Sequence, residues 1–303
     1  FSLDSRRIAF TAERDDDDAA QVYVLDLSGG EARRVTQWPG GARSPRFSPD
    51  GRSILFVGST YPGAVTQDDN RKAAAGSALR NERGFGGRLG NEGETLEATW
   101  TPDGAGVVFA ATTNRHEAAR AEVISSLWHV RLAGGEPRRL TGDEGDYSTP
   151  EFTPDGKVLL AKQQPATDRW VYTADRLVRW SWPSLGDSQA VTRDFDEAVG
   201  QYVPAPDSRR VFFLAERAGH DQLFEVPVAG GTPREVGKLE AGTYSRIAVG
   251  GAGKAPVVAA VWSSAVRPHE LGRVDLRDGR WRSITTFNTE RAAGIDWQPA
   301  EEF

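Results

Sequence analysis

Short apolar runs and tight turns alternate along this chain in a unit that recurs. The unit opens with an apolar or aromatic run that ends in Pro-Asp-Gly or Pro-Asp-Ser, as in residues 46–56, RFSPDGRSILF. Related segments stand at 99–109, 151–161 and 203–213, and a shortened copy opens the chain at 1–10. Proline presets φ, aspartate hydrogen-bonds to its own backbone and glycine accepts positive φ, so each copy predicts a tight turn between two strands.

The remainder of each unit predicts two further strands. In the copy at 99–109 the turn is followed by apolar runs at 107–110 and 127–130, a Gly-Gly turn at 134–135 and a short strand at 138–141. The turn aspartates recur about every 50 residues, a period typical of repeat architectures. They are Asp4, Asp50, Asp103, Asp155 and Asp207.

Four short antiparallel strands per unit predict an all-β fold, a β-propeller of four-stranded antiparallel blades. A parallel β-helix would have a shorter period, and an α-solenoid would show helical periodicity. One blade cannot bury its apolar faces alone, so the array is expected to close on itself. We expect six to eight blades, with seven as the best estimate.

The repeat is irregular in its second unit. Units can be drawn at 1–38, 95–143, 147–194 and 199–238, with a degenerate one at 243–287. The unit that starts at Arg43 loses its pattern after Gly58, so either it carries a long functional excursion or residues are absent from the chain between Gly58 and Glu97. Residues 68–79 have a helix-like composition and are interpreted as part of a loop excursion.

The two ends suggest that the chain is part of a longer natural protein. It starts in the middle of a repeat and contains no methionine. We therefore expect a propeller over residues 1–290, followed at 291–303 by a closing strand or a linker. Residues 294–299 resemble the strand and turn that begin a repeat, and they could pair beside the first blade.

Composition narrows the range of functions. The net charge is −6 and the pI about 5.4, which argues against a nucleic-acid-binding face. No apolar run approaches the roughly 18 residues of a membrane span. The absence of cysteine excludes disulfides and thiolate metal sites within these residues.

The sequence contains no recognisable catalytic, metal-binding or cofactor-binding constellation. Its four histidines, at 116, 129, 220 and 269, lie outside metal-ligand spacing, and His129 is interpreted as packed or at a strand edge. No serine has the Gly-x-Ser-x-Gly setting of a hydrolase nucleophile. The glycines at 84, 86, 87 and 90 precede no predicted helix, which argues against phosphate binding. The acidic run at 15–18 lacks calcium-loop spacing and is interpreted as a solvated hairpin loop.

Residues 80–97, RNERGFGGRLGNEGETLE, combine arginines and glutamates on a glycine-rich backbone. Two interpretations stay open. The segment is a solvated excursion, or its charges line a cleft and capture a peptide terminus. In the second case Glu92 and Glu94 would bind an α-amine, and Arg83 and Arg88 a carboxylate.

The repeats resemble TolB-like propellers and the N-terminal propellers of the prolyl oligopeptidase family. Two end segments resemble the acylaminoacyl-peptidase and dipeptidyl-peptidase branch of that family. Residues 282–303 contain Ile284-Thr285-Thr286-Phe287-Asn288, similar to the segment that leaves the last blade of these peptidases. Residues 257–276 match a last-blade pattern at Ser263, Ser264, Pro268, Glu270 and Leu271, and residues 62–72 are similar to second-blade loops of bacterial members.

This resemblance implies a parent serine peptidase whose Ser-Asp-His triad lies in a C-terminal α/β-hydrolase domain beyond Phe303. The triad is absent from this chain, which would be a non-catalytic lid that gates and selects short peptide substrates. In dipeptidyl-peptidase relatives, propeller glutamates bind the free N-terminus, and Glu92 and Glu94 are the candidates here. The resemblance favours a periplasmic or secreted location, with the cytoplasm as the alternative.

Two other functions remain open. One is a free-standing TolB-like protein-interaction propeller of the bacterial envelope. The other is a propeller enzyme, such as a lyase or a glycosidase, that uses its central channel and would need convergent carboxylates or a metal there.

Overall fold

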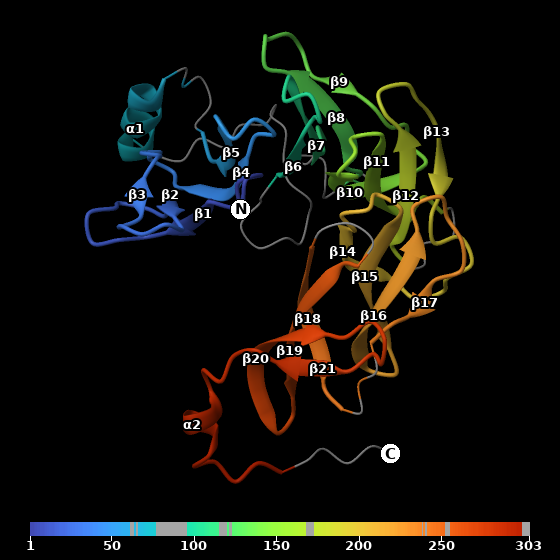
Figure 1. Ribbon diagram of the computed structural model, residues 1–303. Helices are drawn as coiled ribbons and strands as arrows, with labels where there is room; N and C mark the ends of the chain where they lie inside the picture. The colour runs from blue at the N-terminus through green and yellow to red at the C-terminus, as the bar shows by residue number, and fades with distance from the viewer. Residues whose placement is uncertain are drawn as a thin grey trace. The chain divides into compact units, whose positions relative to one another are not determined.

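The computed structural model describes residues 1–60, 64, 66–76, 96–114, 120, 123–167, 173–237, 239, 241–251 and 255–298. They form six antiparallel sheets whose strands are hydrogen-bonded in chain order (Figure 1). The sheets are β1 (Arg7–Ala12), β2 (Gln21–Asp26) and β3 (Arg33–Arg34); β4 (Ala42–Phe47) and β5 (Ile54–Gly58); β6 (Glu97–Trp100), β7 (Gly106–Ala111), β8 (Ser126–Arg131) and β9 (Arg138–Arg139); β10 (Gly145–Phe152), β11 (Val158–Pro165), β12 (Arg176–Ser181) and β13 (Leu185–Ala190); β14 (Val199–Pro204), β15 (Arg210–Arg217), β16 (His220–Pro227) and β17 (Arg234–Glu235); and β18 (Thr243–Gly250), β19 (Val257–Ser264), β20 (Arg267–Val274) and β21 (Trp281–Ser283).

The antiparallel four-stranded blade is confirmed, whereas the expected number of blades is wrong. Four sheets have four strands and one has three, which makes five blades among the described residues, and β4–β5 forms only a hairpin there. Each repeat unit recognised in the sequence gives one of the six sheets. The expectation of six blades fails because the irregular second unit, which it counted as a blade, yields only two described strands. Seven or eight blades would need further units that no repeat in this chain encodes.

The chain divides into two compact units. One comprises Phe1–Asp143 with Tyr147–Pro150, and the other comprises Glu144–Asp146 with Glu151–Phe303. The boundary between them runs through β10. The first unit contains the sheets from β1 to β9, and the second contains those from β11 to β21.

A hydroxyl two residues before the turn aspartate closes the repeated turn. In the β6–β7 turn, Thr101 Oγ1 donates to Asp103 Oδ1 at 2.6 Å, and the N–H groups of Ala105 and Gly106 donate to Asp103 and Thr101 at 3.0 and 2.9 Å. The Thr101 hydrogen bond is the main reason why the pKa of Asp103 lies below its usual range. The same hydroxyl-to-carboxylate contact recurs at Ser2–Asp4, Ser48–Asp50 and Thr153–Asp155.

Removal of one such hydroxyl should destabilise the protein measurably. Thr101→Val keeps the side-chain shape, and it leaves the buried Gly106 N–H without its acceptor. We expect the free energy of unfolding to fall by about 1–3 kcal/mol, measured by chemical denaturation. Thr11→Val, at an exposed position of β1, is the control and should change it by less than about 0.5 kcal/mol. Equal effects of the two substitutions would refute this role of the hydroxyl.

The fifth copy of the turn, at Asp207, departs from this pattern. Ala205 stands where the other copies have serine or threonine, and Asp207 instead accepts from Arg210 Nε and Nη2 at 3.1 and 3.0 Å. Ser208 Oγ accepts from the N–H of Asp155 at 2.9 Å. The altered copy therefore ties two consecutive turns of the second unit together.

The repeated spacing within the units also places a threonine just after the last strand of four of the sheets. Its hydroxyl accepts the N–H of an apolar residue in the preceding strand, at 2.8–3.0 Å. The pairs are Thr36 with Val22, Thr141 with Leu127, Thr192 with Leu177, and Thr285 with Leu271. This contact fixes the short outer strand, which has only two or three residues in these sheets apart from β13.

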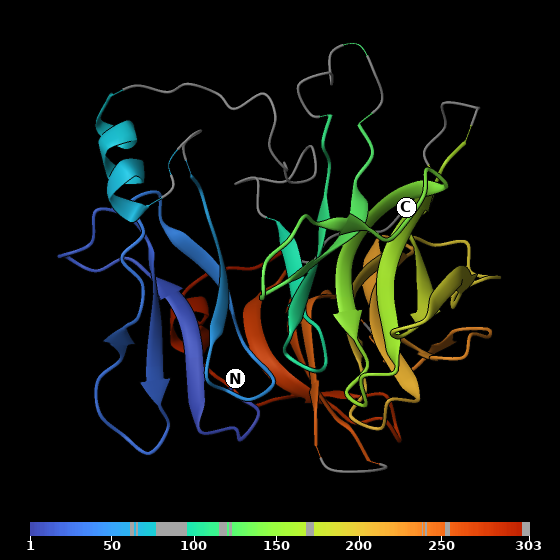
Figure 2. The same cartoon turned by 90° about the horizontal axis from the view of Figure 1, so that it is seen from above.

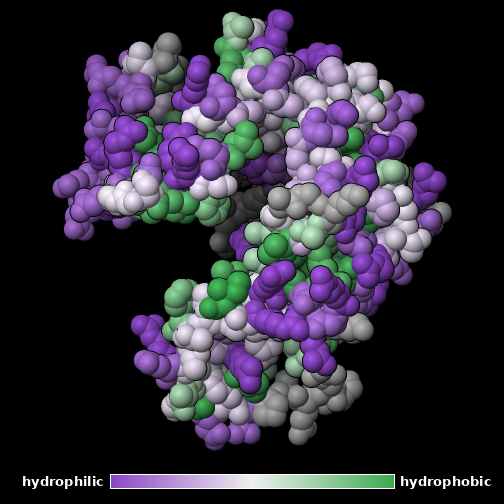
Figure 3. Space-filling model, viewed as in Figure 1, coloured by the Kyte–Doolittle hydropathy of each residue, from purple (hydrophilic) through white to green (hydrophobic). Residues whose placement is uncertain are grey.

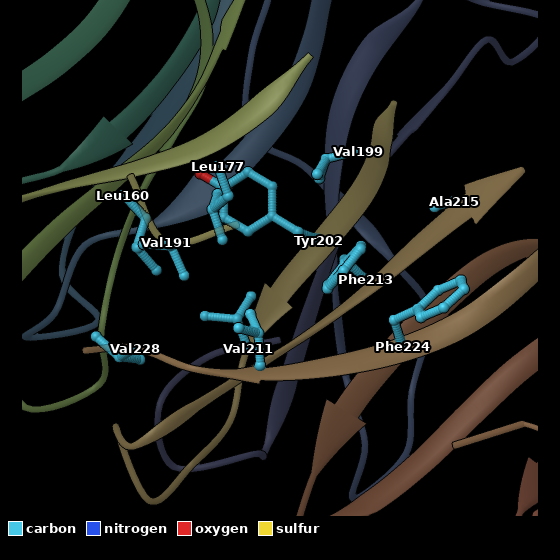
Figure 4. Close-up of a cluster of buried hydrophobic side chains, with 11 residues drawn as sticks. Leu160, Leu177, Val191, Val199, Tyr202, Val211, Phe213, Ala215, Phe224 and Val228 are labelled. Atoms are coloured by element: carbon cyan, nitrogen blue, oxygen red, sulfur yellow. The ribbon is translucent and has the colours of Figure 1, made fainter. Parts of the chain in front are cut away.

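Buried apolar side chains pack between consecutive blades of the second unit. Between the sheet that ends at β13 and the sheet β14–β17, the rings of Phe213 and Phe224, both labelled in Figure 4, stack with centroids 5.5 Å apart. Phe195 packs edge-on against both rings. Leu177 and Val191 of the preceding sheet belong to the same cluster. A second cluster joins β14–β17 to β18–β21 through Leu223, Val236, Tyr244, Ile247, Val258, Ala260 and Val274.

Helix α1 (Gln67–Gly76) corrects the interpretation of residues 68–79 as a loop. Thr66 Oγ1 donates to Asp69 Oδ2 at 2.8 Å and accepts from Asp69 N at 3.1 Å, which caps the first turn of the helix. The buried Asn70 donates to the carbonyl oxygen of Ser59 at 3.2 Å, and Trp38 Nε1 donates to the same oxygen at 2.8 Å. Figure 2 shows α1 at one end of the first strands. Residues 77–79 lie outside the described part.

The end of the chain forms a short helix, α2 (Thr289–Ala292), followed by turns. Trp297 Nε1 donates to the carbonyl oxygen of Ala292 at 3.0 Å. The strand expected at 294–299 is not formed by residues 294–298, and residue 299 lies outside the described part. A boundary between propeller and linker near residue 290 stays a prediction.

Candidate functional site

The four charged residues predicted to bind a peptide terminus, Arg83, Arg88, Glu92 and Glu94, lie outside the described residues. The structure does define the two flanks of their segment. On one side α1 is fixed to Ser59 at the end of β5, as described above. On the other side, Glu97 Oε2 accepts from the N–H of Thr149 at 2.5 Å. The residues on both sides of this segment, α1 and Glu97, are therefore held by hydrogen bonds to other parts of the first unit.

The described histidines do not form a site. His129 packs against Gly106, where an added Cβ would lie 2.5 Å from its Nε2, and burial is the main cause that lowers its pKa. His220 pairs with Arg217 at the tip of the β15–β16 hairpin, and His116 lies outside the described residues. Among the described residues, no group of three potential ligands could hold a metal ion.

The acidic run at 15–18 is only partly a solvated loop. Asp15, Asp16 and Asp18 are exposed, whereas the carboxylate of Asp17 is fully buried. Asp17 accepts from Tyr23 Oη and from Arg34 Nη1, each at 2.6 Å. Asp17 therefore stabilises the β1–β2 loop against its own sheet, and the hydrogen bond from Tyr23 is the main reason why its pKa is lowered.

A network of hydrogen bonds lies where the chain leaves the last sheet. The carboxylate of Glu270 accepts from the hydroxyl of Thr285, from Phe287 N at 3.2 Å and from Asn288 N at 2.7 Å. Asn288 Nδ2 also donates to the carbonyl oxygen of His269 at 2.7 Å. We call Glu270, Thr285, Phe287 and Asn288 the exit clasp. It links residues 257–276, which contain Glu270, to residues 282–303, which contain the other three members. These are the two end segments that resemble peptidase propellers in sequence.

The exit clasp is a charged version of an arrangement in the first sheet. There Gln21 Oε1 accepts from the hydroxyl of Thr36 and from the N–H of Trp38, both at 2.9 Å. Both pairs span 15 residues. In the last sheet a carboxylate takes the place of the neutral amide, and the hydrogen bond from Thr285 is the main cause that lowers the pKa of Glu270.

Large apolar side chains are exposed around the exit clasp. Phe287 is 82 % exposed and Ile284 63 %, and Leu271 and Ile295 are also exposed. Figure 3 shows apolar surface over the last sheet, in the lower part of the view. The clasp holds the backbone on both sides of Phe287 in place, so this ring is presented to the surroundings by an ordered segment. Aromatic side chains, phenylalanine included, are enriched in the cores of interaction surfaces.

Loss of the carboxylate should loosen the exit segment. Glu270→Ala removes the acceptor of the Phe287 and Asn288 amides, and we expect both amides to exchange with solvent much faster in hydrogen–deuterium exchange. Glu270→Gln, which imitates Gln21, is the matched control and should retain most of the protection. Unchanged exchange in Glu270→Ala would show that the clasp does not hold this segment.

The exit clasp should also weaken in acid. The pKa of Glu270 is below its ordinary value of 4.5 in the folded state, so the carboxylate stabilises the clasp fully above pH 4.5. This contribution is lost as the pH falls through the lowered pKa. We therefore expect the protection of the Phe287 and Asn288 amides to decrease below pH 4.5, and to do so less in Glu270→Gln.

Among the described residues, no helix has the length and the apolar character to span a membrane.

No protein-family model matches the chain. Two curated peptidases are similar in sequence. An uncharacterized peptidase, YuxL of Bacillus subtilis, is 32 % identical over 53 % of this chain and 20 % of its own length. Dipeptidyl-peptidase 5 of Porphyromonas gingivalis is 25 % identical over 69 % of this chain and 29 % of its own length. The aligned part of this chain therefore spans less than a third of either peptidase.

A TolB homolog of Chlorobium chlorochromatii is also similar, with 27 % identity over 46 % of this chain and 27 % of its own length. Two solved structures share the fold. The β-propeller domain of the Trilobed protease from Pyrococcus furiosus aligns with a TM-score of 0.64 over 95 % of this chain and 80 % of that chain, at 16 % identity. An acylaminoacyl peptidase aligns with a TM-score of 0.66 over 97 % of this chain and 45 % of that chain, at 18 % identity.

These likenesses confirm the resemblance predicted from the repeats and the end segments. The four-stranded blades and these similar proteins lead to the same conclusion: the chain is a β-propeller that resembles the propellers of prolyl-oligopeptidase-type peptidases, with TolB-like repeats.

Proposed function

We propose that this chain is the non-catalytic propeller domain of a serine peptidase of the acylaminoacyl-peptidase or dipeptidyl-peptidase type, and that it gates and selects short peptide substrates. The exit clasp is the observation that carries this proposal. It orders the chain at the point where it leaves the last sheet, as a connection to a following domain requires, and it is built from the two segments that resemble those peptidases. The names of the two curated relatives support the same function.

The proposed division of labour follows from what this chain contains. The serine, aspartate and histidine of the triad would be supplied by a C-terminal α/β-hydrolase domain of the parent chain, which is the main partner of this domain. The propeller would exclude folded or long polypeptides from the active site, so that peptide length decides access. The boundary at residues 290 and 291 would separate propeller from linker.

Residues 80–97, with their arginines and glutamates, would supply the selectivity for peptide substrates. A free α-amine would be bound by Glu92 and Glu94, and a substrate carboxylate by Arg83 and Arg88, through charge-assisted hydrogen bonds. Its flanks, fixed at α1 and at Glu97, support this assignment because a binding segment needs a rigid base. A periplasmic or secreted location is part of the same proposal, with the cytoplasm as the alternative.

Active-site labelling of the complete gene product tests the proposal. A fluorophosphonate probe reacts with an activated serine nucleophile, and the labelled peptide is identified by mass spectrometry. The proposal predicts one labelled serine outside residues 1–303, with no label in a heat-denatured control. No labelling, or a gene product without a hydrolase domain, would overturn it.

The second candidate is a free-standing TolB-like protein-interaction propeller of the bacterial envelope. The likeness to a TolB homolog over 46 % of this chain favours it. It predicts a gene product without an activatable serine that is recovered from envelope fractions in complex with a partner protein.

A further inference from the structure

Glycine replaces threonine at one of the repeated positions described above. The threonines whose hydroxyls accept the N–H of an apolar residue are Thr36, Thr141, Thr192 and Thr285. In β14–β17 the residue at this position is Gly237. Val236 N and Gly237 N both donate to the carbonyl oxygen of Leu223, at 2.8 and 3.2 Å. The N–H groups of residues 284 and 285 bond to Leu271 in the same way, at 2.8 and 3.1 Å. The backbone arrangement is therefore kept, and only the hydroxyl is missing.

The missing hydroxyl leaves the N–H of Leu223 without the acceptor that its equivalents have. In an extended strand the N–H and the carbonyl of one residue point to the same side, so the Leu223 N–H points toward Gly237. The pairs of β17 with β16 are Phe224–Glu235 and Glu225–Arg234, which do not include Leu223. Leu223 is fully buried. Buried backbone N–H groups are almost always hydrogen-bonded, so this one needs a partner that Gly237 does not supply.

A second buried polar group faces the same place. Tyr244 of β18, in the next sheet, is fully buried, and its hydroxyl has no hydrogen-bond partner among the described residues. A Cβ added to Gly237 would lie 3.4 Å from this hydroxyl oxygen and 3.2 Å from the Cβ of Leu223. Burial raises the pKa of Tyr244, so the phenol stays neutral and can both donate and accept a hydrogen bond. An N–H donor and a hydroxyl therefore flank the space that a threonine side chain takes up in other sheets.

We propose that one buried water molecule lies between Gly237, Leu223 and Tyr244, and that it takes the place of the absent threonine hydroxyl. The water accepts the N–H of Leu223 and donates to the Tyr244 oxygen. Buried waters of this kind bond to polar groups that have no protein partner. The surroundings select the ligand, because the N–H group disfavours a cation and the apolar cluster that contains Val236 and Val258 disfavours an anion.

The water adds a second polar link between two consecutive blades of the second unit. The first link is the Gln201 amide of β14, whose Nε2 donates to the carbonyl oxygen of Ile247 on β18 at 3.0 Å. Its Oε1 accepts from the N–H of Ile247 at 2.9 Å. The water joins the third strand of the same blade, at Leu223, to β18 at Tyr244. All four residues belong to the second compact unit.

A crystal structure of the complete gene product, at a resolution that shows ordered water, tests the proposal directly. We expect a water oxygen within about 3.2 Å of both Leu223 N and Tyr244 Oη. In the variant Gly237→Ser, the serine hydroxyl should displace this water and accept the Leu223 N–H itself. The φ angle of Gly237 is not positive, so the backbone allows a side chain there. A direct hydrogen bond between Tyr244 Oη and Leu223 N, or no water at this place, would overturn the proposal.

Hydrogen–deuterium exchange of single amides supplies a test in solution. Tyr244→Phe removes one of the two partners of the water, so the protection of the Leu223 amide should fall about two- to tenfold. The Leu177 amide is the matched control, because it donates to Thr192 Oγ1 at 3.0 Å and should keep its protection. In the Gly237→Ser background, Tyr244→Phe should leave the Leu223 amide unchanged. Unchanged protection of Leu223 in Tyr244→Phe alone, or an equal loss in both backgrounds, would refute the water site.

Discussion

Phe213→Ala should lower the free energy of unfolding by about 3–5 kcal/mol. The Phe213 side chain is fully buried, stacks on Phe224 and receives the edge of Phe195. Truncation would leave a cavity between two consecutive blades, and the surrounding β-strands have little freedom to collapse into it. Chemical denaturation followed by tryptophan fluorescence measures the effect.

Phe287→Ala is the matched control for this truncation. It removes the same side chain from a position that is 82 % exposed, so we expect the free energy of unfolding to change by no more than about 0.5 kcal/mol. A loss of less than 1 kcal/mol for Phe213→Ala would contradict the assignment of this cluster as the core of the second unit.

Substitution of Glu92 and Glu94 by glutamine in the complete gene product should raise KM about 10- to 100-fold for peptides with a free α-amine. The reason is that two charge-assisted hydrogen bonds to the substrate ammonium are weakened, each of about 1.5–3 kcal/mol. The same peptides with an acetylated N-terminus carry no ammonium group, and their KM should be unchanged. Steady-state kinetics on both series measures the difference.

Glu31→Gln supplies the matched control for the charge change, because Glu31 is an exposed residue of the first unit, just after the Gly29-Gly30 turn. It should leave both KM values unchanged. An equal rise of KM for free and acetylated peptides in the Glu92 and Glu94 variants would show that these residues act on the structure and not on the substrate amine.

The strands and turns were predictable because their signals are local. Pro-Asp-Gly fixes backbone angles whatever surrounds it, and each copy led to a sheet at the expected place. The hydroxyl of Thr101 and its equivalents was not predicted, although a serine or threonine precedes the aspartate by two positions in four of the five copies. Its partner is the N–H of Gly106, on the next strand, and such a contact appears only when the turn is folded.

Most of the features that were not predicted from the sequence depend on contacts between residues far apart in the chain. Glu270 and Thr285 are 15 residues apart, and their pairing depends on the register between β20 and β21. Gln21 and Thr36 are also 15 residues apart, and this repeated separation is the sequence pattern from which the Glu270–Thr285 pair could have been predicted. Helix α1 had a local signal, since Thr66 and Asp69 form a capping pair three residues apart just before an alanine-rich run. The number of blades was not predictable from a period alone, because the period does not say how many units pack together.

The dependence of hydrolysis on peptide length tests the gating role most directly. The complete gene product is assayed with a series of unstructured peptides that share one cleavable sequence and differ only in length, together with a folded protein that displays this sequence in a loop. A gating propeller predicts that kcat/KM falls steeply beyond a limiting length and that the folded protein is not cleaved. Equal kcat/KM across the series, or cleavage of the folded protein at a comparable rate, would contradict the account.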